Sequence, residues 1–426
     1  MKYSTLLPAL ALIVTALAAP AVQAQTTPLP MTTATEAGFS EAGLARIDRF
    51  FEREIAQNRV PGAVVAIARD GKLVYYKSFG WLDKDQVKPM PLNAIFGLAS
   101  MTKIMTAVGA LSLTQEGMLP LQSRLSQYFP NFASMKVAVR NADGSEGYEA
   151  QKRPIFVHDL FRHTAGLTYG GRPDSGSPAS KLYPPGDSLP KMASADEFIQ
   201  KITQLPLVYQ PGTIFEYSES MDVLGAVIEK ISRKTLGGHL SQVIWQPLGM
   251  KDTGFHISAD KRDRVAQPLK LNPLTGQPQR IQTTAEDVHF ECGGGCSVGT
   301  IGDYLRFGQM LMNGGSLDGH QILSPAIVRL MTSNHLGKEI VNRVANVEPH
   351  REGYGFGLGV AVRMEPGLAA VPGHAGEYTW NGAYGTGFFA DPQEKLVVVY
   401  GTVAPGDLRK YYREQVQDLV YGAMTR

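Results

Sequence analysis

Hydrophobic positions repeat every three or four residues over several stretches of the chain, which is the spacing of one face of a helix. One such stretch follows Ser100, and its apolar positions are Met101, Ile104, Met105, Val108 and Leu111. The same spacing predicts further helices over residues 40–59, 154–164, 195–205, 222–232, 299–313, 324–331 and 407–424. The helix that begins at Ser100 is apolar enough to be buried.

Shorter apolar runs near the two ends of the chain predict strands. Residues 62–68 and 73–79 are joined by a turn that contains Asp70-Gly71, a strong hairpin signal. Three more strands are expected near the C-terminus, at residues 354–362, 382–390 and 395–401.

This order of elements predicts an α/β (α+β) architecture. The antiparallel sheet would be built from both termini and flanked by helices, with a mainly helical domain inserted. We place the sheet domain at residues 25–95 and 291–426, and the helical domain at residues 96–290.

The N-terminus has the features of a secretory signal. Lys2 gives a basic start, residues 6–19 are apolar, and Val22-Gln23-Ala24 fits a cleavage site after Ala24. The sequence therefore predicts a signal peptide at residues 1–24 and a periplasmic or secreted mature protein. Later apolar runs fall short of a membrane span, so we expect no stable membrane insertion.

Charge and cysteine content exclude some functions. The 41 basic and 39 acidic residues give a formal charge of +2, which predicts no nucleic-acid partner. Cys292 and Cys296 are either bridged across three glycines or free thiols, and an oxidising compartment favours the bridge. The nine histidines form no metal-binding spacing, so we infer neither a metal nor a cofactor.

Ser100 is followed three residues later by Lys103, and on a helix these side chains are neighbours. A serine beside an amine can be a nucleophile, and the helix N-terminus favours a developing oxyanion. The same spacing begins at Ser188 and Ser258, but neither opens a buried helix. An ordinary helix-capping serine remains the alternative for Ser100.

Two other segments carry groups that suit acyl transfer. Tyr217 precedes the helix at residues 222–232, and a phenolate beside a lysine could accept the serine proton. His374 lies between glycines before a predicted strand, where an imidazole and a close backbone N–H could face the Ser100 helix. Taken singly, Tyr217 is more typical of a packed aromatic and His374 of a structural histidine.

Together these segments resemble the serine β-lactamase and penicillin-binding superfamily, which includes class C β-lactamases, D-alanyl-D-alanine carboxypeptidases and family VIII carboxylesterases. The resemblance extends from about residue 36 to the C-terminus. Its supporting stretches are residues 60–63, 159–167, 217–218, 222–225, 303–307, 373–376, 384–388 and 391–392. It implies a β-lactamase/transpeptidase-like fold.

The resemblance also implies roles for particular residues. Ser100 would attack the substrate carbonyl, and Lys103 with Tyr217 would relay the proton. The N–H groups of Ser100 and Glu377 would form the oxyanion hole. His374 would occupy the first position of the family's third motif, in which Gly376 is the last, and would bind the substrate or Tyr217.

Two departures from the β-lactamase motifs concern substrate recognition. Glu219 replaces the asparagine of Tyr-x-Asn, and an ionised carboxylate cannot donate a hydrogen bond. His374-Ala375-Gly376 replaces Lys-Thr-Gly, so a fixed cation becomes a mostly neutral imidazole. Both changes favour an uncharged small-molecule ester over an anionic lactam, and the leading prediction is a serine esterase for short-chain carboxylic esters. Aromatic residues such as Tyr169, Tyr378 and Trp380 are candidates for the acyl pocket.

Several alternatives remain open. The same machinery could serve a β-lactamase or a D-alanyl-D-alanine carboxypeptidase, and a regulatory protein could be acylated without turnover. Ser297 stands in a G-x-S-x-G match, but a glycine-rich loop precedes it instead of a strand, so we interpret it as a helix cap. The oligomeric state is left open.

Overall fold

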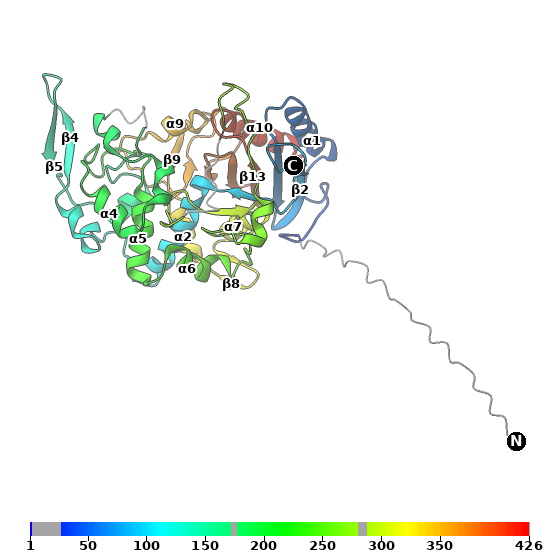
Figure 1. Ribbon diagram of the computed structural model, residues 1–426, viewed down its shortest axis with the longest axis horizontal. Coiled ribbons are helices and arrows are strands. Elements are labelled where there is room, and N and C mark those ends of the chain that lie inside the picture. Colours follow the sequence, from blue (N-terminus) through cyan, green and yellow to red (C-terminus); the bar gives the residue numbers. More distant parts are fainter. Residues whose placement is uncertain (2–26, 172–176, 280–287, 426) are drawn as a thin grey trace.

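A seven-stranded antiparallel sheet forms the centre of the computed structural model, which describes residues 1, 27–171, 177–279 and 288–425. The strand order is β2-β1-β13-β12-β11-β10-β9 (Figure 1). The strands are β1 Gly62–Arg69, β2 Lys72–Gly80, β9 Tyr354–Phe356, β10 Ala361–Arg363, β11 Tyr378–Asn381, β12 Thr386–Asp391 and β13 Leu396–Thr402. Because β1 pairs with β13, the two ends of the chain share one sheet, which confirms the predicted fold.

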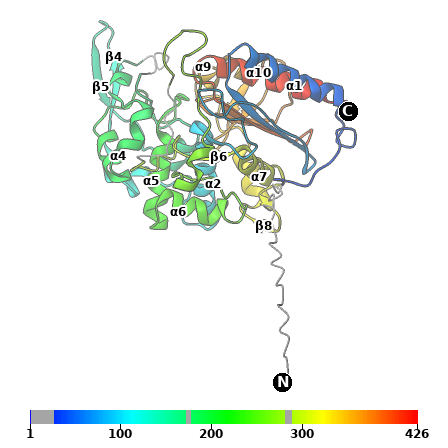
Figure 2. The same cartoon turned by 45° about the vertical axis from the view of Figure 1, so that its right-hand side comes forward.

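Two helices cover one face of this sheet, α1 (Glu41–Ala56) and α10 (Leu408–Ala423) (Figure 2). Successive side chains of a strand point to opposite faces of the sheet, so one strand contributes residues to a hydrophobic core on each face. In β1, the residues under α1 and α10 are Ala63, Val65 and Ile67, and the residues facing the main core are Val64, Ala66 and Ala68.

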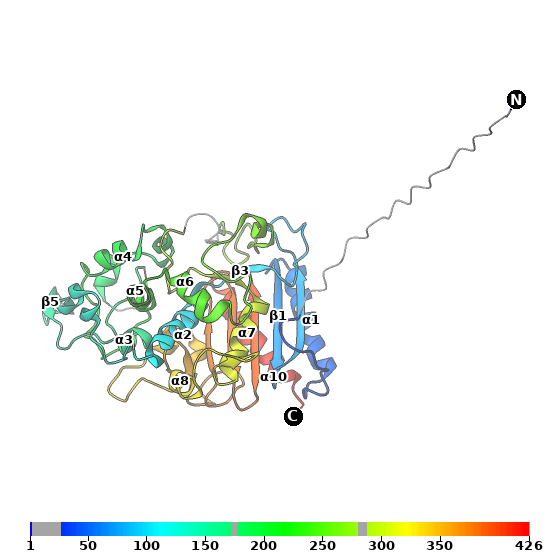
Figure 3. The same cartoon turned by 90° about the horizontal axis from the view of Figure 1, so that it is seen from below.

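The opposite face is covered by α7 (Ile301–Met312), which packs on β13 and β1. The helix α2 (Thr102–Gln115) lies next to α7, on the side toward the short helices (Figure 3). Gly308 lets α7 approach closely, because a Cβ there would lie 2.7 Å from the Phe388 ring. Every residue of α2 from Thr102 to Leu113 is buried, so this helix is enclosed by protein on all sides.

The middle of the chain forms a separate group of short helices beside the sheet (Figure 1). These are α3 Val157–Phe161, α4 Ala195–Ile202, α5 Ser220–Ser232 and α6 Leu236–Leu240, which runs into a π-helical turn at Ser241–Trp245. Smaller elements complete the fold: β3 Ile95–Gly97 pairs with β6 Val298–Thr300, β7 Ser316–Leu317 with β8 His320–Gln321, and α8 Pro325–Met331 and α9 Val344–Val347 follow.

The region expected to be mainly helical also contains a β-hairpin that the sequence analysis did not predict. Its strands are β4 (Lys136–Arg140) and β5 (Glu146–Ala150), and it projects from the end of the molecule remote from α1 (Figure 1). Each strand is only five residues long and has charged residues among its apolar ones, so the hydrophobic alternation that predicts a strand is short here.

Near the C-terminus, two predicted strands are wrong in their bounds. Residues 354–362 form β9 and β10 with a turn between them, because Gly359 has φ 87° and the Gly357 N–H donates to Val360 O. Residues 382–390 do not form one strand: a turn ending at Gly385 precedes β12, and β11 lies before that turn.

The predicted signal peptide falls almost wholly on residues 2–26, outside the described residues. Among the residues that are described, none of the helices combines the length and the apolar character that a membrane span requires.

Candidate active site

Ser100 occupies a strained turn at the start of α2. The 3-10 turn Ala99–Met101 leads directly into the helix, and Ala99 has φ 45°, a region that residues other than glycine rarely adopt. Two hydrogen bonds hold this turn: Thr102 Oγ1 donates to Ala99 O at 2.6 Å, and the Leu98 N–H donates to Ser297 O at 2.9 Å. The serine is therefore presented at a helix N-terminus by a fixed backbone.

Lys103 and Tyr217 converge on the Ser100 hydroxyl, as the sequence predicts. Lys103 Nζ lies 3.3 Å from Ser100 Oγ, and the Tyr217 hydroxyl donates to the same oxygen at 2.7 Å. The ammonium also lies 4.7 Å from the centre of the Tyr217 ring and 5.3 Å from that of Tyr169. Lys103 is 1 % exposed, so this contact is shielded from water.

Lys103 is held from its far side by a glycine carbonyl. Its Nζ donates to Gly294 O, and the Gly294 N–H donates to Asp222 Oδ1 at 2.7 Å. Burial raises the pKa of Asp222 to about 6, against the opposing attraction of Lys103. The sequence analysis noted Asp222 only within a supporting stretch and missed this connection, because it depends on a loop 72 residues further along the chain.

The strand that faces Ser100 is the end of β11. Trp380 Nε1 donates to the Tyr217 hydroxyl at 3.3 Å. The chain then passes the serine turn closely, since a Cβ on Gly382 would lie 2.5 Å from Leu98 O. Ala383, the next residue, lines both cavities that adjoin Ser100. Residues 380–383 therefore take the position that the sequence analysis gave to residues 374–377.

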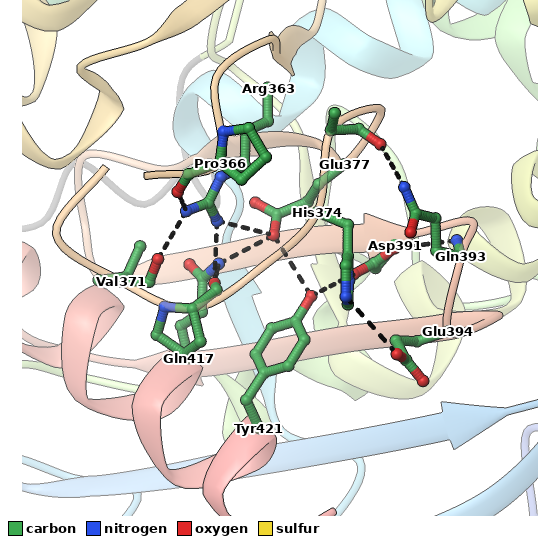
Figure 4. A network of polar contacts seen from close by, with 12 residues as sticks. Arg363, Pro366, Val371, His374, Glu377, Asp391, Gln393, Glu394, Gln417 and Tyr421 are labelled. Atoms are coloured by element: carbon green, nitrogen blue, oxygen red, sulfur yellow. Dashed lines mark hydrogen bonds and ion pairs between the residues drawn. The ribbon is translucent and has the colours of Figure 1, made fainter. Parts of the chain in front are cut away.

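His374 and Glu377 lie in a different network, which corrects their predicted place in the site (Figure 4). His374 Nδ1 lies 2.7 Å from Asp391 Oδ2, and its Nε2 lies 3.8 Å from Glu394. The Glu377 N–H donates to His374 O at 3.1 Å within a turn, so it is not directed at Ser100. Gly376 belongs to this same turn, at the opposite end of β11 from Trp380.

The Glu377 carboxyl group has a structural role instead, because its contacts link the sheet to α10. It accepts from the Tyr354 hydroxyl at 2.6 Å. It also accepts from Gln417 Nε2 at 3.0 Å, and Arg363 NH1 lies 3.6 Å away (Figure 4). Burial raises the pKa of Glu377 to about 7. The network connects the sheet to α10.

Glu219 is buried at the start of α5 and does not line either cavity beside Ser100, as far as the described residues define them. Burial, with Asp222 nearby, raises its pKa well above the usual range for a carboxyl group. The prediction of a substrate-contacting carboxylate is therefore not supported. A protonated Glu219 can also donate a hydrogen bond, which the ionised form assumed from the sequence cannot.

Two cavities meet at Ser100 and differ in character. One, of about 350 Å³, has a mainly apolar lining that includes Tyr169, Leu189, Pro190 and Tyr384. Of the three aromatic candidates for an acyl pocket, Tyr169 lies here, whereas Trp380 lines the other cavity. Tyr378 lines neither cavity among the described residues.

The second cavity, of about 410 Å³, is basic. Its charged lining residues are Glu348, Arg351, Arg409, Lys410 and Arg413. Burial lowers the pKa of Arg351 to about 10 and that of Arg413 to about 9, which reflects cations held in a poorly solvated place. Arg351 lies over the Trp380 ring at 4.0 Å, and Arg413 donates to Gly382 O at 2.6 Å. The sequence analysis identified none of these arginines, because they come from separate segments.

Ser297 and the cysteines are close to the site but differ in role from Ser100. Cys292 and Cys296 form a disulfide, with Cα atoms 5.3 Å apart. Ser297 Oγ is 1 % exposed and lies 2.6 Å from Thr102 Oγ1. It does not cap a helix as expected: Thr300 caps α7 by accepting from the Asp303 N–H at 3.1 Å. Among the described residues, no cluster of His, Cys, Asp and Glu could hold a metal ion.

The Ser100 hydroxyl contacts a buried lysine and a tyrosine, and it lies at a helix N-terminus beside the end of a strand. This arrangement defines a serine acyl-transfer enzyme. A family model described as Beta-lactamase matches residues 47–419. The chain belongs to the β-lactamase family, and it is a serine hydrolase of that superfamily.

Relatives and solved structures support this assignment. Protein Rv1367c of Mycobacterium tuberculosis is 34% identical over 347 residues, covering 80% of this chain and 84% of its own length. Esterase EstB of Burkholderia gladioli is 30% identical over 364 residues, covering 82% of this chain and 87% of its own. The structure of EstCE1, described as a hydrolase with promiscuous acyltransferase activity, matches with a TM-score of 0.71 and 29% identity. That match covers 89% of this chain and 99% of that one.

Proposed function

We propose that this protein hydrolyses esters of short-chain carboxylic acids through an acyl-enzyme on Ser100. The observation that carries the proposal is the double contact on Ser100 Oγ, from Tyr217 at 2.7 Å and from Lys103 at 3.3 Å. A serine held by two linked groups is prepared to attack a carbonyl carbon when that pair is one proton short and can take up the serine proton.

In the acylation step, Ser100 Oγ forms a bond to the ester carbonyl carbon and gives its proton to the Tyr217–Lys103 pair, which enters the step with one proton fewer than a phenol and an ammonium hold together. The resulting oxyanion would be stabilised by the N–H groups of Ser100, in the turn that leads into α2, and Ala383, two residues after β11. When the tetrahedral intermediate collapses, the C–O bond to the alcohol breaks, and the pair returns the proton to the leaving alkoxide.

In the deacylation step, water takes the place of the alcohol. The Tyr217–Lys103 pair accepts a proton from the water as it attacks the acyl carbon, and then returns one to Ser100 Oγ. The products are the free acid and the regenerated serine. Trp380 Nε1, which donates to the Tyr217 hydroxyl at 3.3 Å, would stabilise negative charge on that oxygen in both steps.

The preference for short esters rests on the apolar cavity. Its volume of about 350 Å³ and its lining by Tyr169, Leu189 and Pro190 suit a small apolar acyl or alcohol group. The name of Esterase EstB and the description of EstCE1 as a hydrolase support the same reaction class.

A lactam or D-alanyl peptide substrate is the second candidate, and one observation favours it. The basic cavity places Arg351, Arg409 and Arg413 beside Ser100, although the Lys-Thr-Gly lysine is missing from the sequence. Glu348 in the same cavity already pairs with Arg351 and Arg413, so a substrate carboxylate could pair with Arg409 and share the other two. The sequence argument against anionic substrates is therefore weaker than it first appeared.

We also propose that the mature protein is exported. The sequence of residues 1–24 and the Cys292–Cys296 disulfide both support an oxidising compartment. N-terminal sequencing of the protein recovered from the periplasm or medium should give Gln25 as the first residue. Recovery of the protein from the cytoplasm with Met1 intact would contradict export.

The function is tested by comparing turnover of 4-nitrophenyl butyrate with that of a chromogenic cephalosporin. We expect the ester to be cleaved far faster, and Ser100→Ala to lower that rate by at least about a thousandfold. Ser258→Ala is a matched control, because Ser258 has the same serine-lysine spacing but is exposed and remote from the cavities. It should keep the wild-type rate. Faster cephalosporin turnover would select the second candidate instead.

A further inference from the structure

A five-residue loop closed by the Cys292–Cys296 disulfide lies against the helix that carries Ser100. Both cysteines are only 2 % exposed, and the three residues between them are glycines. The loop is also closed by backbone hydrogen bonds, since the Cys296 N–H donates to Cys292 O at 3.2 Å.

Neighbouring residues of this loop bind residues on one face of α2. The Gly293 carbonyl accepts from Thr106 Oγ1 at 2.8 Å, and the Gly294 carbonyl accepts from Lys103 Nζ. Just after the loop, the Ser297 N–H donates to Thr102 Oγ1 at 3.1 Å. The start of α2, from Thr102 to Thr106, is thus bonded to one short segment.

The loop backbone is confined between α2 and α5. A Cβ on Gly293 would lie 2.6 Å from Met221 O, and a Cβ on Gly294 would lie 2.4 Å from Asp222 Oδ2. Only glycine fits at these positions without displacement. A run of three glycines, however, has more conformational freedom than any other sequence of that length. Some restraint is needed to keep the Gly294 carbonyl at one position.

We propose that the Cys292–Cys296 disulfide is a positioning element for Lys103, and that it acts by fixing the Gly294 carbonyl. This inference rests on the proposed role of Lys103 in activating Ser100. The bridge closes the glycine run at both ends, so the carbonyl remains where it orients the Lys103 amine toward Ser100 Oγ. Both cysteines also pack into the main core, but the bridge joins residues only four apart in sequence, and the sheet and the core under α1 and α10 are built from other segments, so we expect the fold to form without the bridge.

The test is the Cys292→Ser/Cys296→Ser double variant, which removes the bridge while keeping side chains of similar size. Nucleophile activation is measured as the rate at which a 4-nitrophenyl alkylphosphonate labels Ser100 and releases one equivalent of 4-nitrophenol. This readout needs no ester turnover, so failure of the ester proposal and failure of this one are distinguishable.

We expect the double variant to fold, with a normal circular dichroism spectrum, and to label between about 10 and 100 times more slowly than the wild type. The pH dependence of labelling should also change, because the group that accepts the proton has moved. With 4-nitrophenyl butyrate, the loss should appear mainly in kcat and much less in KM. Wild-type labelling with an unchanged pH profile would overturn the proposal, as would a variant that fails to fold.

Two further variants make the result specific. Gly294→Ala keeps the bridge but forces the carbonyl segment away from Asp222, and should slow labelling to a similar degree. Val416→Ala removes buried apolar volume under α1 and α10, remote from the loop, and should lower the melting temperature while labelling at the wild-type rate. Slow labelling by Val416→Ala would show that general destabilisation explains the effect, and would overturn the proposal.

Discussion

Tyr217 receives stabilising contacts on each side of its hydroxyl group. Its oxygen donates to Ser100 Oγ at 2.7 Å and accepts from Trp380 Nε1 at 3.3 Å, while the Lys103 ammonium lies over its ring. Once the phenol loses its proton, the indole N–H and the ammonium both stabilise the negative oxygen. This arrangement suits a group that alternately holds and releases the serine proton.

Replacing Tyr217 with Phe should therefore lower kcat for 4-nitrophenyl butyrate by about 10²- to 10⁴-fold, with a much smaller change in KM. Steady-state kinetics at several pH values would measure this. Tyr183→Phe is the matched control, because its buried hydroxyl donates to Pro206 O at 3.0 Å and contacts neither cavity. Near-normal turnover in Tyr217→Phe would remove the tyrosine from proton transfer.

Ser100, Lys103 and Tyr217 could be predicted from the sequence because each belongs to a local motif. The serine and the lysine are one helical turn apart, and the tyrosine directly precedes a helix. Asp222 and Gly294 could not be connected in this way, because their contact joins α5 to a loop distant in sequence. Burial also changed the chemistry of Glu219, whose raised pKa was invisible in the sequence.

At the scale of elements, the position of one turn decides which residues face the serine. The segment 378–390 is almost continuously apolar or small, so its pattern does not show where β11 ends and β12 begins. The pairing of Trp380 with Phe388 places the turn at residues 382–385. With one strand predicted at residues 382–390, the third motif was assigned to His374, which lies between glycines before that strand.

The network at the start of β11 predicts a pH dependence of stability. Burial raises the pKa of Glu377 from 4.5 to about 7, so the folded protein keeps this proton at pH values where the unfolded chain has lost it. The contribution of Glu377 to stability is thus fully present below about pH 4.5 and is lost as the pH rises toward 7. The loss amounts to at most about 3 kcal/mol.

Urea unfolding of wild type and Glu377→Gln between pH 4.5 and 7.5 would measure this contribution. The amide cannot ionise, so the variant should gain in stability relative to the wild type as the pH rises. A constant difference between the two proteins across this range would contradict the raised pKa.

At the scale of the whole molecule, the sheet brings both ends of the chain to one site. β1 and β13 pair, α7 packs on both of them, and β11 presents its end to Ser100. The fold could be predicted because strands near both termini and helices between them permit few arrangements. The hairpin β4–β5 and the basic cavity could not, since the hairpin strands are too short for a clear hydrophobic pattern and the cavity gathers charged residues from separate segments.

The central claim is that Ser100 carries the acyl group during turnover. The most direct measurement is mass spectrometry of the protein quenched in acid during reaction with 4-nitrophenyl butyrate, followed by digestion. We expect one butyryl group on the peptide that contains Ser100, in the wild type and in Ser258→Ala, and none in Ser100→Ala. A butyryl group on another residue, or undiminished ester turnover by Ser100→Ala, would contradict the account.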